Sequence, residues 1–189
     1  MLACALAMLL AQSGARPPVE DFDLLPKEAI PDAAAVARQK EVERKLDERR
    51  KLLRLHQLGG VTMLATLGTT VVLGELDYLD KYGGRGDTGK WHQWHRWTAF
   101  SAATLFAGTA ALALLAPVPV EKPVRLDTAT LHKIFMSVAA AGMVAQIVLG
   151  VWTANKEGQV SQRDFALAHQ VIGFATFAAA GAGFTVWVF

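Results

Sequence analysis

The sequence has little cysteine and little charge, and both shortages exclude classes of protein. Cys4 is the single cysteine among 189 residues, so the chain cannot form an internal disulfide framework. Charged residues make up 19% and hydrophobic residues 52%, which is too apolar for a disordered chain and low in charge for a cytosolic one. The net charge of +2 gives no support to nucleic-acid binding.

Long apolar runs dominate the remainder of the chain. Four of them approach the roughly 20 residues that a helix needs to cross a bilayer. They cover about residues 58–76, 97–116, 134–154 and 165–189. Short polar loops at about 77–94, 117–131 and 155–164 join them, and such loops make consecutive helices antiparallel neighbours. We therefore expect an all-α, up-down-up-down four-helix transmembrane bundle, a multi-pass integral protein of a bacterial inner membrane.

The N-terminal third is different, because ten of the 19 Lys and Arg residues lie in the first 54 positions. Residues 1–15 have a short apolar core that ends in Ser-Gly-Ala, as a signal peptide does. Residues 16–55 form a charged arm, in which we expect a juxtamembrane helix from an N-cap at Asp32 to Leu55. The transmembrane domain would then cover residues 56–189.

The sidedness signals conflict. Eight Lys and Arg between Arg38 and Arg54 place the arm in the cytoplasm by the positive-inside rule. A cleaved signal peptide would place the same arm outside. The sequence leaves both orientations open.

The histidines follow a repeat. His56, His95, His132 and His169 each stand at the N-terminal edge of a different apolar run, with separations of 39, 37 and 37 residues. A polar residue follows each of them, and an apolar residue follows that. The first and third runs also share a glycine at one spacing after the histidine, Gly74 after His56 and Gly150 after His132. One histidine on a span edge is often an interfacial polar residue, but four at one repeat position indicate a functional role.

The alternation of helix direction predicts how the histidines pair. The first and third helices start at one membrane face, so His56 can meet His132, and His95 can meet His169 at the other face. Two imidazoles make a poor zinc site, but they suit the two axial positions of a b-type haem. Small residues around them would leave room for a porphyrin: Gly59, Gly60, Ala102, Ala103, Ala139, Ala140 and Gly173.

A haem with both axial positions filled is suited to outer-sphere electron transfer. About 20 residues separate the two faces, so at 1.5 Å per residue two such irons would lie roughly 20 Å or a little more apart. The pattern therefore predicts electron transfer across the membrane.

Four helices, one histidine per helix and the pairing of alternate helices resemble the cytochrome b561 superfamily. The resemblance covers roughly residues 55–189 and leaves the arm unmatched. It implies two haems b, one near each face, with His56 and His132 as the axial iron ligands of one and His95 and His169 as those of the other. The better-known eukaryotic members have six spans instead of four.

Other polar residues adjoin these histidines. His92 precedes His95 by one helical turn and is an alternative ligand, or a group through which a proton or electron passes. Arg54, Arg96 and Lys133 could bind haem propionates or could be interfacial cations. The run Gly84-Arg85-Gly86-Asp87-Thr88-Gly89-Lys90 resembles a phosphate-binding loop, but Trp91 replaces the magnesium-binding Ser or Thr.

Several functions fit this pattern. The first is a dihaem protein that passes electrons between a quinol or a soluble redox protein and an acceptor. A ferric or quinone reductase with an exposed haem edge, a haem-free structural subunit of a membrane complex and a metal transporter are the alternatives. Besides lipid, the partners could include a second copy of the chain or a larger redox complex, and we expect no nucleic acid.

Overall fold

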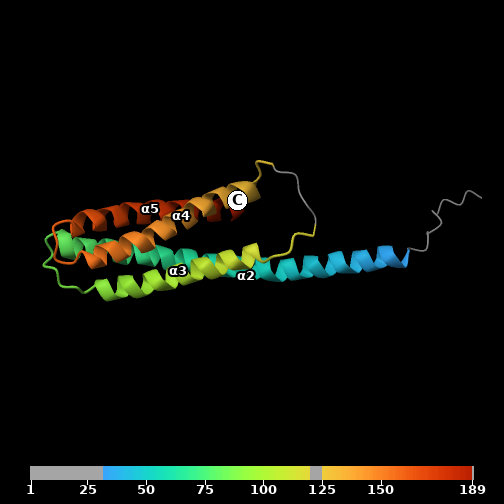
Figure 1. Cartoon of the computed structure of the whole chain (residues 1–189), viewed down its shortest axis with the longest axis horizontal. Coiled ribbons are helices and arrows are strands. Elements are labelled where there is room, and N and C mark those ends of the chain that lie inside the picture. The colour runs from blue at the N-terminus through green and yellow to red at the C-terminus, as the bar shows by residue number, and fades with distance from the viewer. Residues whose placement is uncertain (1–31, 120–124, 189) are drawn as a thin grey trace, which may run out of the picture. The chain divides into compact units, whose positions relative to one another are not determined.

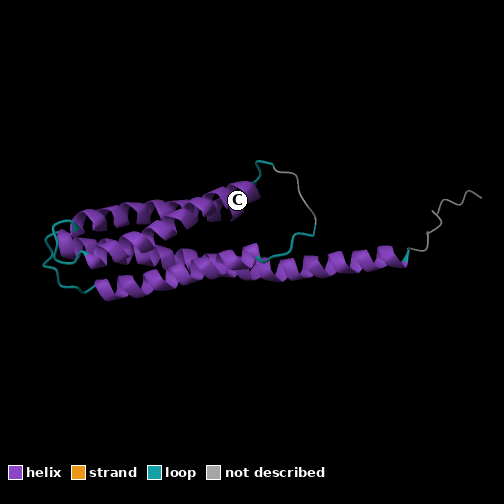
Figure 2. Cartoon of the chain, in the orientation of Figure 1, coloured by secondary structure: helices purple, strands orange, loops and turns teal. Residues whose placement is uncertain are grey.

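The structure is a computed structural model that describes residues 32–119 and 125–188, so the signal peptide expected over residues 1–15 lies outside the described residues. The described part is helical without strands (Figures 1 and 2). Its helices are α2 (Ala33–Tyr82), α3 (His92–Leu114), α4 (Thr128–Asn155) and α5 (Gln162–Val188). All four are long and apolar enough to cross a membrane, which confirms the all-α class and is consistent with a multi-pass membrane protein.

The chain divides into two compact units, residues 1–39 and residues 40–189. The described part of the first unit is residues 32–39, which are helical from Ala33. The second unit contains the remainder of α2 and the three other helices, and the candidate site lies within it.

Helix α2 is one uninterrupted helix of 50 residues, whereas the sequence suggested an arm helix over residues 32–55 followed by a separate span. No proline occurs in it to break the hydrogen-bond ladder. Gly59 and Gly60 lie inside the helix, and a glycine there costs about 1 kcal/mol against alanine without ending the helix. The charged part of the arm is therefore continuous with the apolar part.

Two aspartates cap helices. The side chain of Asp32 accepts a hydrogen bond from the backbone N–H of Ala34 at 3.2 Å, which confirms the predicted N-cap of α2. Asp127 caps α4 in the same way, accepting from the backbone N–H of Thr130 at 2.8 Å. Both side chains satisfy amides that the first turn of a helix leaves without a partner.

Contacts within residues 40–189 show which parts of neighbouring helices lie beside each other. His56, on α2, contacts the carbonyl of Thr109 near the end of α3, and His95, near the start of α3, packs against Gly74 farther along α2. On the second helix pair, His132 of α4 contacts the carbonyl of Gly183 near the end of α5. The loops that join α2 to α3 and α4 to α5 lie at the same end (Figure 1).

The buried core follows the histidine repeat. Most of the buried helix residues lie about two, three or four helical turns after the histidine of their helix, along one face. They are Met63, Leu67 and Thr70 on α2, Ala102, Phe106 and Thr109 on α3, Ala139 and Met143 on α4, and Thr176, Ala180 and Gly183 on α5. The histidine of each helix therefore marks the face that points into the bundle.

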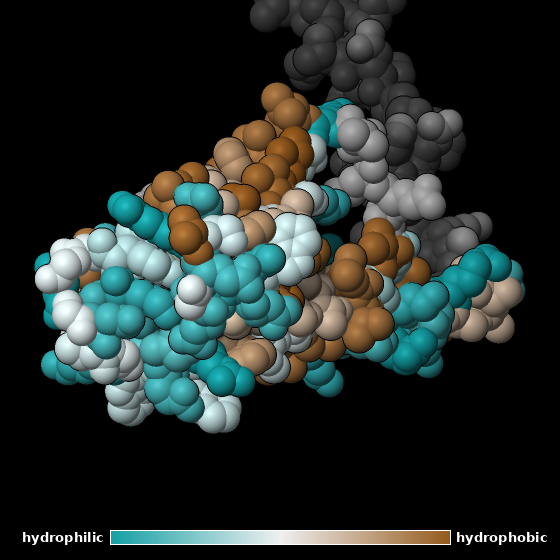
Figure 3. Space-filling model, turned by 60° about the vertical axis from the view of Figure 1, so that its left-hand side comes forward, coloured by the Kyte–Doolittle hydropathy of each residue, from teal (hydrophilic) through white to brown (hydrophobic). Residues whose placement is uncertain are grey.

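The outward faces are apolar. On α4, Val138, Ile147 and Val151 each leave more than half of their surface exposed. In Figure 3 brown hydrophobic side chains cover the flanks, and teal hydrophilic ones gather at the end that comes forward. Apolar flanks with a polar end match a protein whose sides contact lipid.

The loop between α2 and α3 is held by Asp80, whose side chain is buried although charged. Its carboxylate accepts hydrogen bonds from the Thr88 hydroxyl at 2.9 and 3.0 Å and from the backbone N–H of Gly89 at 2.9 Å. The loop that resembles a phosphate-binding sequence is thus held by hydrogen bonds to the C-terminal end of α2, the helix that precedes it.

We expect Asp80→Ala to lower the free energy of unfolding by about 1–3 kcal/mol, because it removes the buried carboxylate that accepts the hydrogen bonds of Thr88 and Gly89 in this loop. Thermal unfolding of the purified protein in detergent measures the loss. Asp87→Asn, in the same loop, is the matched control: Asp87 is exposed and has a φ of 49°, which asparagine also adopts. Equal losses in the two variants would contradict the role of Asp80.

Candidate functional site

Four histidines form two pairs, one toward each end of the helices. The rings of His56 and His132 have centroids 6.0 Å apart, with their planes at 83°. The rings of His95 and His169 also have centroids 6.0 Å apart, with their planes at 88°. The structure therefore brings together the same pairs that the sequence repeat predicted, with nearly identical geometry.

Backbone carbonyls hold three of these rings through Nδ1. His56 Nδ1 lies 2.8 Å from the carbonyl oxygen of Thr109, and His132 Nδ1 lies 2.9 Å from that of Gly183. His95 Nδ1 lies 3.1 Å from the carbonyl oxygen of Thr70. In each case the acceptor belongs to the other helix of the same sequential pair, so each ring is fixed across a helix–helix contact.

These contacts determine the tautomer. A carbonyl oxygen can only accept a hydrogen bond, so Nδ1 must carry the proton and donate it. In the neutral imidazole the lone pair then belongs to Nε2. A metal-binding histidine ordinarily has this arrangement, in which the N–H that does not face the metal is fixed by a backbone carbonyl or a carboxylate.

His169 has a looser version of the same arrangement. The backbone carbonyl of Gln146 is near its ring, but Nδ1 is buried without a hydrogen bond in the described residues. The Gln146 side chain instead donates from Nε2 to the backbone carbonyl oxygen of His169 at 2.6 Å. A buried polar nitrogen without a partner is costly, which makes His169 the least satisfied of the four rings.

The carbonyl partners obey the repeat as well. Thr70, Thr109, Gln146 and Gly183 all follow the histidine of their own helix at one common spacing. That spacing is close to four helical turns, so each helix presents a histidine and, four turns farther along, a carbonyl beside its neighbour's histidine. The α2–α3 pair and the α4–α5 pair are thus two copies of one arrangement.

The ring separations fit a shared metal ion between each pair. Bonds from an imidazole nitrogen to a first-row metal are about 2 Å long, so rings on opposite sides of one ion have centroids about 6 Å apart. Both pairs already have this spacing. In the described residues no group of three or more His, Cys, Asp or Glu side chains is placed to hold a metal ion. Each candidate site therefore offers two imidazoles.

A cavity of about 320 Å³ adjoins the first pair. Its walls include His56, His132, Gly60, Met63, Met136 and Phe184. Of the small residues expected to leave room there, Gly60 lines it, whereas Ala102 and Ala139 are fully buried in the helix core. Gly59 instead packs against the Thr109 side chain, and Gly173 against that of Gln146.

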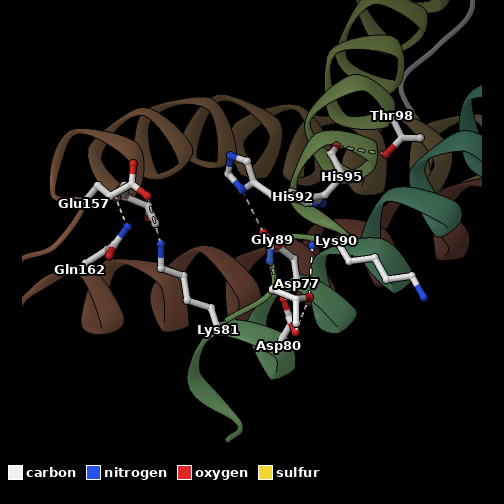
Figure 4. A network of polar contacts seen from close by, with 12 residues as sticks. Asp77, Asp80, Lys81, Gly89, Lys90, His92, His95, Thr98, Glu157 and Gln162 are labelled. Atoms are coloured by element: carbon white, nitrogen blue, oxygen red, sulfur yellow. Dashed lines mark hydrogen bonds and ion pairs between the residues drawn. The ribbon is translucent and has the colours of Figure 1, made fainter. Parts of the chain in front are cut away.

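The second pair has polar neighbours. Gln170, the residue after His169, donates a hydrogen bond to the carboxylate of Glu75. His92 extends toward Asp77, with its Nδ1 3.2 Å from Oδ2, and 63% of its side chain is exposed (Figure 4). The ring that lies against His169 is that of His95.

The three cations expected beside the histidines are exposed. Arg96 lies over the Phe100 ring, with its guanidinium carbon 6.0 Å from the ring centroid. Within the described residues, none of Arg54, Arg96 and Lys133 takes part in an ion pair. Their positions are compatible with binding a carboxylate at the bundle ends and equally with an interfacial role.

Sequence reasoning missed the carbonyl partners, because a backbone oxygen has no residue type by which to recognise it. Their common spacing after the histidines would have found them once helix pairing was assumed. No protein family, no curated protein and no solved structure matches this chain.

Proposed function

We propose that this protein binds two b-type haems, each between one pair of histidines, and transfers electrons across a membrane. His56 and His132 would hold one haem iron, and His95 and His169 the other. The proposal includes the up-down-up-down transmembrane topology, with the charged part of α2 outside the bilayer as a juxtamembrane extension. The cytochrome b561 superfamily is the family whose arrangement this resembles.

The observation that carries the proposal is the reciprocal anchoring of the rings. Two imidazoles with a 6.0 Å centroid separation occur twice, and three of the four rings donate Nδ1–H to a carbonyl of the neighbouring helix. That arrangement leaves the Nε2 lone pair for an iron, and it fixes the ring direction before any cofactor binds. Histidines placed only for interfacial hydrogen bonding would not need this repeated geometry.

A haem with two imidazole ligands supplies a one-electron carrier without an open position for oxygen or substrate. The chain's own part is to hold the rings, exclude water and set the distance between the pairs. From His56 to Gly74, the residue that contacts His95, α2 rises about 27 Å at 1.5 Å per residue. The two pairs thus lie at opposite ends of the apolar part of α2, as a route across a bilayer requires.

Partners follow from this role. Electrons would come from a quinol or a soluble redox protein and leave to an acceptor on the other side. A bacterial inner membrane is the location that we propose, and a homo-oligomer or a larger redox complex is compatible with the exposed apolar flanks.

The test is a reduced-minus-oxidised visible spectrum of the purified protein, with haem quantified as the pyridine haemochrome. The protein must come from cells that have adequate haem. We expect two haems b per chain. Colourless protein would contradict the proposal and favour a haem-free structural subunit of a membrane complex.

A further inference from the structure

We propose that Gly74 and Gly150 are positioning residues, which set where the rings of His95 and His169 lie. The steric part of this inference stands on the geometry alone. Its consequence for cofactor binding rests on the function proposed above.

Gly74 gives His95 the space that its ring occupies. A Cβ atom at position 74 would lie 2.8 Å from Cε1 of His95, closer than real Cβ atoms approach, and 3.0 Å from its Nδ1, tighter than most real contacts. One turn earlier on α2, the Thr70 carbonyl holds Nδ1 of the same ring at 3.1 Å. Because the ring is anchored there, it cannot move away from a methyl group at position 74 without straining or losing that hydrogen bond.

Gly150 stands in the same relation to His169. A Cβ atom at position 150 would lie 3.3 Å from Cε1 of His169, and Gln146, one turn earlier, supplies the neighbouring carbonyl. Both glycines follow the histidine of their own helix at the same spacing, which is about five helical turns. The sequence repeat therefore has a structural reason, since each of α2 and α4 places a backbone carbonyl, and then a glycine without a side chain, beside a neighbour's histidine.

The need for a glycine beside the histidine ring is specific to the end of the bundle that holds His95 and His169. On α3 and α5 the residues at the corresponding repeat position are Ala113 and Trp187. A glycine inside a helix costs about 1 kcal/mol against alanine, so a glycine without a steric task is expected to be replaceable at a gain. Gly108 on α3 is of that kind, because a Cβ atom there would meet nothing within 4 Å.

The first experiment compares Gly74→Ala, Gly150→Ala and the control Gly108→Ala in the purified full chain. Overpacking at position 74 is expected to release the haem of the His95–His169 pair to excess apomyoglobin about tenfold faster or more. Gly150→Ala should have a smaller effect, since its methyl group would meet the ring less closely. Gly108→Ala should release haem as the native chain does. Equal release from all three variants would overturn the inference.

A second experiment separates steric positioning from a general role in helix packing. Gly74→Ala is combined with His95→Ala, and thermal unfolding is followed by circular dichroism, a readout that does not require bound haem. With His95 present, Gly74→Ala should lower the unfolding midpoint. In the His95→Ala background it should leave the midpoint unchanged or raise it, because the ring that it would strike is gone.

The same midpoint decrease in both backgrounds would overturn the positioning role, because Gly74 would then matter to the helix contact and not to the histidine. This outcome is distinct from failure of the proposed function. A native chain that binds no haem would remove the proposed function while leaving the coupling between Gly74 and His95 measurable in the unfolding midpoints.

Discussion

His56→Ala and His132→Ala should each reduce the haem content from two per chain to one, and the double variant should not reduce it further. The reason is that both rings would hold the same iron, so losing either removes the same site. His95→Ala should also leave one haem, but combined with His56→Ala it should leave none. Pyridine haemochrome quantification of purified variants distinguishes these patterns.

His92→Ala is the matched control for this series. It removes an imidazole from the same helix as His95, yet the His92 side chain is largely exposed and pairs with Asp77. We expect it to retain both haems. Loss of a haem in His92→Ala with full content in His95→Ala would show that the pairing at this end is wrong.

Much of the fold could be predicted from the sequence, because hydrophobic length alone identifies helices that can cross a membrane. The N-cap at Asp32 was recognisable from its residue type and position, and the structure confirms it. The pairing of His56 with His132 followed from counting helices, since alternate helices of an up-down bundle start at the same face. These predictions rest on periodicity and length, which a single sequence contains.

Other features could not be predicted, for identifiable reasons. The charged and apolar parts of α2 differ in composition, but no helix-breaking residue separates them, so composition suggested a boundary where the backbone has none. Asp80 accepts hydrogen bonds from Thr88 and Gly89, which follow it in the next loop. Residue propensities do not determine the path of that loop, so the contact could not be foreseen. The glycine at position 74 was visible in the repeat, but its reason required knowing which ring lies against it.

Electron transfer across a vesicle membrane should fall at least about tenfold when either histidine pair is broken. The protein is reconstituted into liposomes that contain ferricyanide, and a membrane-impermeant reductant is added outside. Reduction of the trapped ferricyanide is followed by its absorbance. His132→Ala and His169→Ala should both abolish most of the rate, because about 21–27 Å of α2 separates His56 from Thr70 and Gly74, the residues that contact His95, and the electron needs both carriers to cross.

The comparison with a reductase makes this result informative. If one haem edge received electrons and reduced an acceptor at the same face, only one of the two pairs would be needed, and the native chain would not reduce the trapped ferricyanide. The His92→Ala variant tests whether electrons enter or leave through the exposed His92, since such a route requires its imidazole. Full transmembrane transfer in His92→Ala, together with loss in both His132→Ala and His169→Ala, would therefore identify a relay through the two half-buried pairs.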